Sequence, residues 1–151
     1  MAVDLDKLLA AAVERGASDV HLKPGSPPIL RVDARLTPQT GRPALTAEDM
    51  DAIARRLLPE RLYRQLHEGR ETDCGYALAG GTRFRVNMFL ALGQVRAVLR
   101  AIPARKPRFE ELGLPPVLEK LCGERRGLVL VTGVTGSGKS TTLAALVDLI
   151  N

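Results

Sequence analysis

The chain has 151 residues, of which 45% are hydrophobic and 26% charged, a composition typical of a soluble globular protein. No apolar run approaches the roughly 18 residues of a membrane span, and Asp4 and Asp6 stand where a secretory signal would carry basic residues. Cys74 and Cys122 have no metal-binding spacing around them, which argues against a zinc site and a disulfide framework. These features favour a cytoplasmic protein.

The charge balance is basic, with 22 Lys and Arg against 17 Asp and Glu, and a formal net charge of +5. Most of the basic residues are arginines, which suit phosphate-bearing partners. Proteins that bind single-stranded nucleic acid usually offer aromatic side chains for stacking, and this chain has three Phe, two Tyr and no Trp. We therefore expect a phosphate-bearing ligand and no nucleic acid.

The first hundred residues alternate between helical and strand patterns. Apolar residues at helical spacing predict a helix from Leu5 to Gly16, with Asp4 as its cap, and a second helix that begins at Thr46 and stops at Pro59. A short third helix is expected over residues 60–68. Between the first two helices, alternating apolar and polar residues predict two short strands, one over residues 18–25 and one over residues 29–36.

Residues 71–102 alternate with a period of two, which predicts three strands joined by turns at Gly80-Gly81 and near Gly93. A two-residue loop at Leu92-Gly93 would pair positions whose numbers sum to 185, so that apolar residues face each other and Arg85 faces Arg100. Residues 1–103 are accordingly predicted to form an α+β domain whose antiparallel sheet packs its apolar face under the helices.

A proline-rich and charged segment, residues 104–116, is predicted to be an interdomain linker. Beyond it, residues 117–151 begin a second domain with a helix near its start. The continuous apolar run over residues 127–132 suits a buried parallel strand, and a helical pattern covers residues 139–151.

Residues 133–140, GVTGSGKS, match the phosphate-binding loop pattern G-x-x-x-x-G-K-[S/T] at every defined position. Glycines let backbone N–H groups approach phosphate oxygens, and the following helix adds the positive end of its dipole. Lys139 is expected to reach the β- and γ-phosphates of ATP, and the Ser140 hydroxyl to bind Mg²⁺. The candidate nucleotide-binding residues are Gly133, Thr135, Gly136, Ser137, Gly138, Lys139, Ser140 and Thr141.

Hydrolysis also requires acidic residues that hold the metal and orient water, and we find no strand ending in such a residue in this sequence. We therefore expect the chain to be the N-terminal portion of a longer nucleotide hydrolase, and we expect these 151 residues alone not to hydrolyse ATP. A module that binds nucleotide without catalysis is the alternative.

Four segments together resemble the PilT-type retraction ATPases of type IV pili, within the superfamily of type II secretion and pilus-assembly ATPases. They are GASDVHLKPGSPPILRVD, RFRVNMF, AVLRAIP and RGLVLVTGVTGSGKSTTLAALVDLIN. The resemblance implies a PAS-like N-terminal domain, followed here by the truncated start of a RecA-like phosphate-loop α/β domain. It also implies a cytoplasmic homohexamer, peripheral at the inner membrane, that works with a pilus platform protein in twitching motility. Pilus-assembly and type II secretion ATPases remain alternatives.

Arg83, Arg85 and Arg100 lie on the polar face of the predicted hairpin, where opposed like charges are unfavourable unless an anion or a carboxylate joins them. The resemblance implies that arginines of this sheet approach the bound nucleotide, so at least one of the three is a candidate catalytic residue, with Arg96 an outside candidate. A solvated basic face is the alternative. For His21, a structural hydrogen bond is favoured over catalysis.

Overall fold

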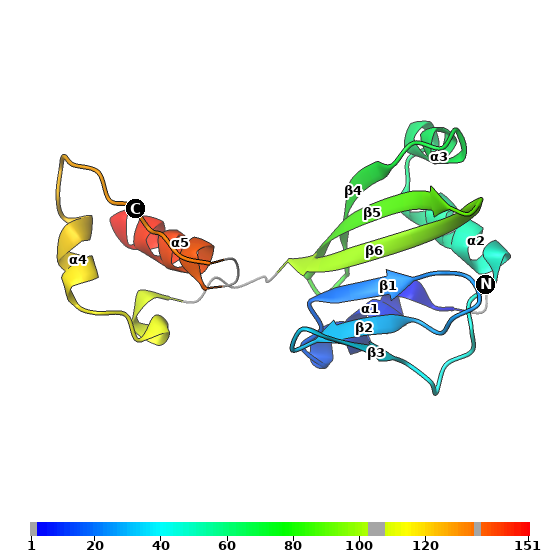
Figure 1. Cartoon of the computed structure of the whole chain (residues 1–151), viewed down its shortest axis with the longest axis horizontal. Coiled ribbons are helices and arrows are strands. Elements are labelled where there is room, and N and C mark those ends of the chain that lie inside the picture. The colour runs from blue at the N-terminus through cyan, green and yellow to red at the C-terminus, as the bar shows by residue number, and fades with distance from the viewer. Residues whose placement is uncertain (1–2, 103–107, 135–136) are drawn as a thin grey trace. The chain divides into compact units, whose positions relative to one another are not determined.

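The computed structural model describes residues 3–102, 108–134 and 137–151. Contacts within the chain divide it into two units, residues 1–104 and residues 105–151 (Figure 1).

The first unit contains one sheet in which every pair of neighbouring strands is antiparallel, in the order β3-β2-β1-β6-β5-β4. Its helices are α1 (Leu5–Glu14), α2 (Ala47–Leu57) and α3 (Glu60–His67). Its strands are β1 (Asp19–Leu22), β2 (Ile29–Val32), β3 (Arg35–Pro38), β4 (Thr72–Ala77), β5 (Arg83–Ala91) and β6 (Gln94–Ile102). This arrangement agrees with the predicted α+β class.

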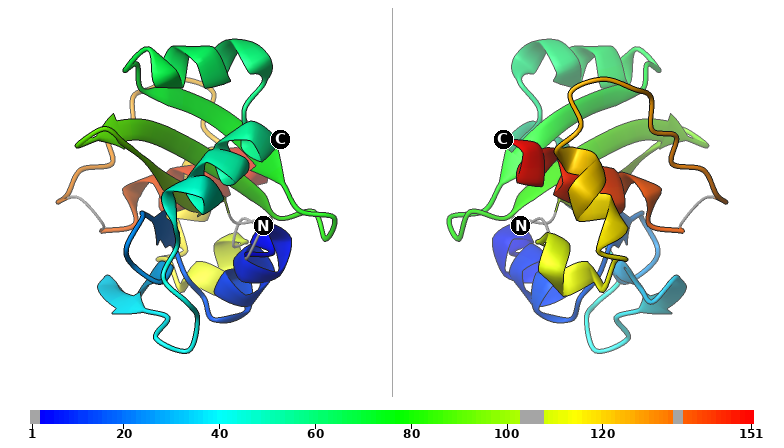
Figure 2. Two further views of the ribbon diagram at one scale, coloured as in Figure 1. Left: turned by 90° about the vertical axis from the view of Figure 1, so that its right-hand side faces the viewer. Right: turned by 90° about the vertical axis from the view of Figure 1, so that its left-hand side faces the viewer.

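The helices cover one face of this sheet and leave the other face open. Figures 1 and 2 show α1 and α2 on the same side of the strands, and α2 contacts β6 while α3 contacts β5. The core between the two layers includes Leu9 of α1, Met50 and Ile53 of α2, and Phe84 and Leu99 of the sheet, all almost fully buried. Since strand side chains alternate between faces, burying these residues directs the arginines of β5 and β6 to the opposite face.

Local capping explains where the two longer helices begin. The Asp4 side chain accepts a hydrogen bond from the Lys7 backbone N–H at 3.2 Å, which confirms the predicted start of α1. At α2, Thr46 and Asp49 each bond the other's backbone N–H at 3.1 Å, a reciprocal capping box. Both caps satisfy N–H groups that have no partner inside the helix.

The long hairpin has the predicted register, because β5 and β6 pair Phe84 with Ala101 and Arg85 with Arg100 around a turn at Leu92-Gly93. The expectation of a single strand over residues 29–36 is wrong: β2 and β3 form a second hairpin there. Its turn consists of Asp33 and Ala34, which both have positive φ, 46° and 63°. The prediction missed this turn because the pair contains no glycine.

The second unit contains the short 3₁₀ helix η1 (Phe109–Leu112), α4 (Val117–Cys122) and α5 (Lys139–Ile150). The buried strand predicted over residues 127–132 is not formed, and Leu128 and Leu130 are 83% and 74% exposed. A parallel strand needs a neighbouring strand for its backbone N–H and C=O groups, and the described part of this unit supplies none. Across the described residues, no helix is long and apolar enough to span a membrane.

Candidate functional site

The candidate phosphate-binding loop leads into the N-terminus of α5. Gly138 caps this helix with φ 89°, a left-handed conformation that favours glycine, and it has no side chain with which to bond the first-turn N–H groups. Gly133 has φ 151°, and a Cβ there would lie 2.8 Å from the Ser137 Oγ. A side chain would therefore be strained at both positions. No side chain caps the first turn of α5, so its N–H groups are available to a ligand.

Lys139 lies across this loop. Its Nζ donates hydrogen bonds to the backbone carbonyls of Gly133, at 2.8 Å, and Val134, at 2.7 Å. Ser137, Ser140 and Thr141 are exposed at the start of the helix. The remaining two predicted nucleotide-binding residues, Thr135 and Gly136, lie outside the described residues.

The loop offers hydroxyl oxygens rather than a ready-made metal site. Among the described residues, no group of three or more His, Cys, Asp or Glu side chains could hold a metal ion. Mg²⁺ in nucleotide sites is usually bound by one or two protein oxygens together with phosphate oxygens and water, and the exposed Ser140 hydroxyl fits that arrangement.

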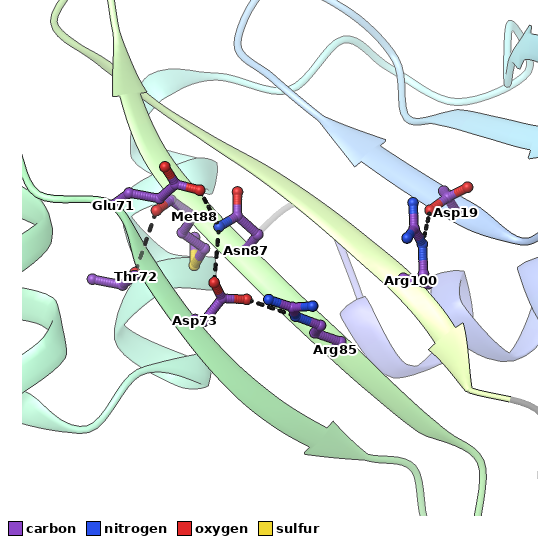
Figure 3. Close-up of polar contacts among 8 residues, drawn as sticks. All are labelled: Asp19, Glu71, Thr72, Asp73, Arg85, Asn87, Met88 and Arg100. Carbon is purple, nitrogen blue, oxygen red and sulfur yellow. Dashed lines mark hydrogen bonds and ion pairs between the residues drawn. The ribbon is translucent and has the colours of Figure 1, made fainter. Parts of the chain in front are cut away.

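The three candidate arginines lie on the open face of the sheet in the first unit, and two of them bind carboxylates on flanking strands (Figure 3). Arg100 donates from Nε to Asp19 Oδ1 at 2.9 Å, and Arg85 donates from Nε to Asp73 Oδ1 at 3.0 Å. Each of the two opposed arginines thus has a carboxylate on its outer side, from β1 or from β4, and these negative charges offset the unfavourable pairing predicted for them.

Asp19 is the more enclosed of the two carboxylates, with only 5% of its side chain exposed. Its second oxygen lies 3.3 Å from Arg31 Nε and accepts a hydrogen bond from Ser18 Oγ at 2.9 Å. Burial opposes the charged form, but hydrogen bonds from Arg100 and Ser18 and the charges of both arginines outweigh it, so the pKa of Asp19 is lowered. The carboxylate is ionised at neutral pH.

Asp73 belongs to a more exposed polar network. Asn87 donates to Glu71 at 2.6 Å and to Asp73 at 3.4 Å, and the hydrogen bond from Arg85 lowers the pKa of Asp73. A hollow of about 310 Å³ lies over this network and extends to Val98 and Arg100. The hollow is lined by arginines and carboxylates together, so it is not a simple anion pocket.

Three other polar residues of this face, Arg83, Arg96 and His21, do not share the carboxylate contacts of Arg85 and Arg100 in the described part of the chain. Arg83 forms no ion pair or hydrogen bond with the described residues and lines a second hollow with Arg85. Arg96 Nε and His21 Nε2 are buried without a hydrogen-bond partner in the described part of the chain. The hydrogen bond expected for His21 is therefore not seen at Nε2. Burial and then the charge of Arg31 lower the pKa of His21, which favours the neutral imidazole.

The family model for type II/IV secretion system proteins matches residues 1–151, the whole chain. The chain belongs to this family. It is 41% identical over 149 residues to the type IV pilus retraction ATPase PilT of Pseudomonas aeruginosa, and this alignment covers 99% of the chain and 43% of the relative. The chain therefore spans less than half the length of this relative.

Solved structures give the same relationship. A crystal structure of the pilus retraction motor PilT with bound ADP matches with a TM-score of 0.85 at 41% identity, over 98% of this chain and 43% of that chain. The ATPase DotB of Legionella pneumophila matches with a TM-score of 0.82 at 29% identity, over 95% and 41%. The fold of this chain is thus that of the N-terminal portion of these ATPases.

Sequence reasoning missed the two carboxylates that hold the arginines. Asp19 and Asp73 each stand at a polar position in an alternating segment, so the period of two assigns them to the arginine face. The order of the strands, which places β1 beside β6 and β4 beside β5, was needed to pair each acid with its arginine. That order joins residues 81 positions apart along the chain.

Proposed function

We propose that this chain is the ATP-binding N-terminal part of a motor ATPase that powers type IV pilus retraction. The observation that carries the proposal is the 41% identity to the PilT retraction ATPase, which extends through a complete phosphate-binding loop. The structure of PilT with bound ADP supports nucleotide binding by this loop. The full-length protein would act as a cytoplasmic homohexamer at the inner-membrane face, in contact with a pilus platform protein.

In this proposal, ATP binds at the N-terminus of α5. The N–H groups of the loop and of the first helical turn would bind phosphate oxygens, and Ser140 would contribute an oxygen to Mg²⁺. Lys139 now donates to two backbone carbonyls, and the γ-phosphate, with its greater charge, would replace them as acceptor. Mg²⁺ would neutralise charge on the phosphates during transfer.

The arginines of the open sheet face would serve hydrolysis rather than nucleotide affinity. Guanidinium groups stabilise charge on a transferred phosphoryl group, and Arg83, Arg85 and Arg100 present three such groups on two adjacent strands. We expect at least one of them to be required for turnover and dispensable for folding, because none is part of the buried core.

The phosphate-loop assignment is tested by Lys139→Ala in the full-length protein. The variant should lose ATP binding or turnover, because it removes the charge directed at the phosphates. Lys120→Ala is the matched control, since it removes another lysine of the same unit, on α4. Unchanged Mg-ATP hydrolysis by Lys139→Ala would contradict the assignment.

The role of the arginines is tested by alanine variants at positions 83, 85 and 100, assayed one at a time for turnover and thermal unfolding. A turnover loss of at least about a hundred-fold in one variant, with an unchanged unfolding midpoint, is the expected result. Wild-type turnover in all three variants would show that these arginines have no role in hydrolysis and form only a solvated basic face.

A further inference from the structure

The two opposed arginines of the open sheet face bind carboxylates that differ in burial. Asp19, which binds Arg100, has 5% of its side chain exposed, whereas Asp73, which binds Arg85, has 46% exposed. We propose that Asp19 is a positioning residue for Arg100 and holds its guanidinium in the orientation needed for ATP hydrolysis. This proposal rests on the proposed function and adds to it a residue that positions one of the candidate arginines.

The hydrogen bonds of Asp19 fix the direction in which its carboxylate faces. Oδ1 accepts from Arg100 Nε at 2.9 Å, while Oδ2 is bound by Ser18 at 2.9 Å and lies 3.3 Å from Arg31 Nε. Since both oxygens are engaged, the carboxylate cannot rotate without losing a contact. It therefore presents Oδ1 to Arg100 in one orientation.

The strands around Asp19 make this arrangement rigid. Asp19 lies on β1, in the interior of the sheet, and pairs directly with Arg31 on β2 and Arg100 on β6. Figure 3 shows the Arg100 side chain directed toward Asp19. A functional group on paired strands whose partner is itself held by further hydrogen bonds is positioned more precisely than one on a loop.

Without this carboxylate, Arg100 would have little to hold it. Its side chain is 70% exposed, and its neighbour on β5 is Arg85, which carries the same charge. An exposed arginine beside a like charge would sample many rotamers, and the favoured ones would turn away from the neighbour. Asp19 removes that freedom before nucleotide arrives.

The contact between Arg85 and Asp73 does not provide the same constraint. Asp73 lies on β4, an edge strand, and both partners of this ion pair are well exposed, at 68% and 46%. Exposed pairs of this kind contribute little, because water competes for both groups. Of the three candidate arginines, Arg100 is therefore the one whose carboxylate partner is buried and held by further contacts.

The test is Asp19→Asn in the full-length protein, with kcat and KM for ATP measured separately. Misplacing Arg100 should lower kcat about ten-fold, and KM should stay unchanged because the phosphate-binding loop is intact. Asp51→Asn is the matched control. Asp51 also binds an arginine Nε, that of Arg55 at 3.0 Å, but it lies on α2, on the helix-covered side of the sheet. The control should keep the wild-type kcat.

A double-variant cycle separates positioning from a structural role. If Asp19 acts through Arg100, Asp19→Asn should cause no further loss of kcat in the Arg100→Ala background. Should Asp19→Asn fail to fold, Asp19→Glu keeps the charge but moves the carboxylate, and it should lower kcat in the same way. Wild-type kcat in the folded Asp19 variant would overturn the proposal, and so would an equal loss of kcat with and without Arg100.

The same experiment shows whether the inference or the function has failed. A low kcat in Arg100→Ala together with a wild-type kcat in Asp19→Asn would overturn only the positioning role. Wild-type kcat in Arg100→Ala would remove Arg100 from the reaction, and with it the role of Asp19. Absence of Mg-ATP turnover in the full-length wild-type protein would overturn the proposed function and the positioning role together.

Discussion

Ala34 has a backbone conformation that an alanine rarely adopts. It is the second residue of the turn between β2 and β3, with φ 63°, where its Cβ crowds the neighbouring backbone. Ala34→Gly should therefore raise the free energy of unfolding by about 1 kcal/mol, measured by denaturant or thermal unfolding. Ala10→Gly, on the exposed side of α1, is a control of opposite sign and should lower it by about 1 kcal/mol. Equal effects of the two changes would contradict the strain at Ala34.

The lowered pKa of Asp19 should make the stability of the folded protein depend on pH. Because its pKa is lowered in the folded protein, this carboxylate stabilises the fold above its unfolded pKa of about 3.9, and that contribution is lost as the pH falls through the folded pKa. The difference in unfolding midpoint between the wild type and Asp19→Asn should accordingly be largest near neutral pH and shrink below about pH 4. A difference that is constant from neutral to acid pH would argue against the lowered pKa.

At the scale of elements, the N-terminus of α2 depends on its capping box. Thr46→Ala removes the hydroxyl that binds the Asp49 N–H and should lower the free energy of unfolding by about 1 kcal/mol. Thr40→Ala, in the exposed loop before α2, is the control and should have little effect. Chemical denaturation of both variants measures the difference, and equal stabilities would show that the cap contributes nothing.

The sequence predicts a hairpin well where the alternation of apolar residues in both strands and the residues of the connecting turn indicate the same register. The β5-β6 hairpin follows from strict alternation on both sides of Leu92-Gly93, because a shift of one residue would expose Phe84 and Leu99. The β2-β3 hairpin was missed, since Asp33-Ala34 lacks the glycine that usually marks such a turn. Residues 127–132 have the composition of a buried strand, but a strand forms only where a neighbour pairs with it.

The candidate site could be predicted only in part, for a related reason. The phosphate-binding loop is contiguous, so its glycines, Lys139 and Ser140 can be recognised from spacing alone. The arginine face combines residues from four strands, and the partner of Arg100 comes from the start of the chain. The sequence indicated that the arginines needed an anion, but only the strand order shows that Asp19 and Asp73 supply it.

At the scale of the whole molecule, burial is concentrated in the first unit. Among the described residues, the buried hydrophobic side chains lie between Val3 and Leu99, apart from Ala145 and Leu146 on α5. In the described part of the chain, the core of the sheet and its helices is therefore built from residues of the first unit. Folding free energy in domains of this size comes mainly from such a core.

Residues 1–102 expressed alone should consequently fold and unfold in one cooperative transition, with the midpoint of the corresponding transition of the 151-residue chain. Circular dichroism during heating measures both proteins. Thr46→Ala is a useful control in each, because a cap inside the first unit should shift the two midpoints equally. A truncated protein that lacks a cooperative transition, or that melts well below the longer chain, would show that contacts with residues 105–151 stabilise the sheet.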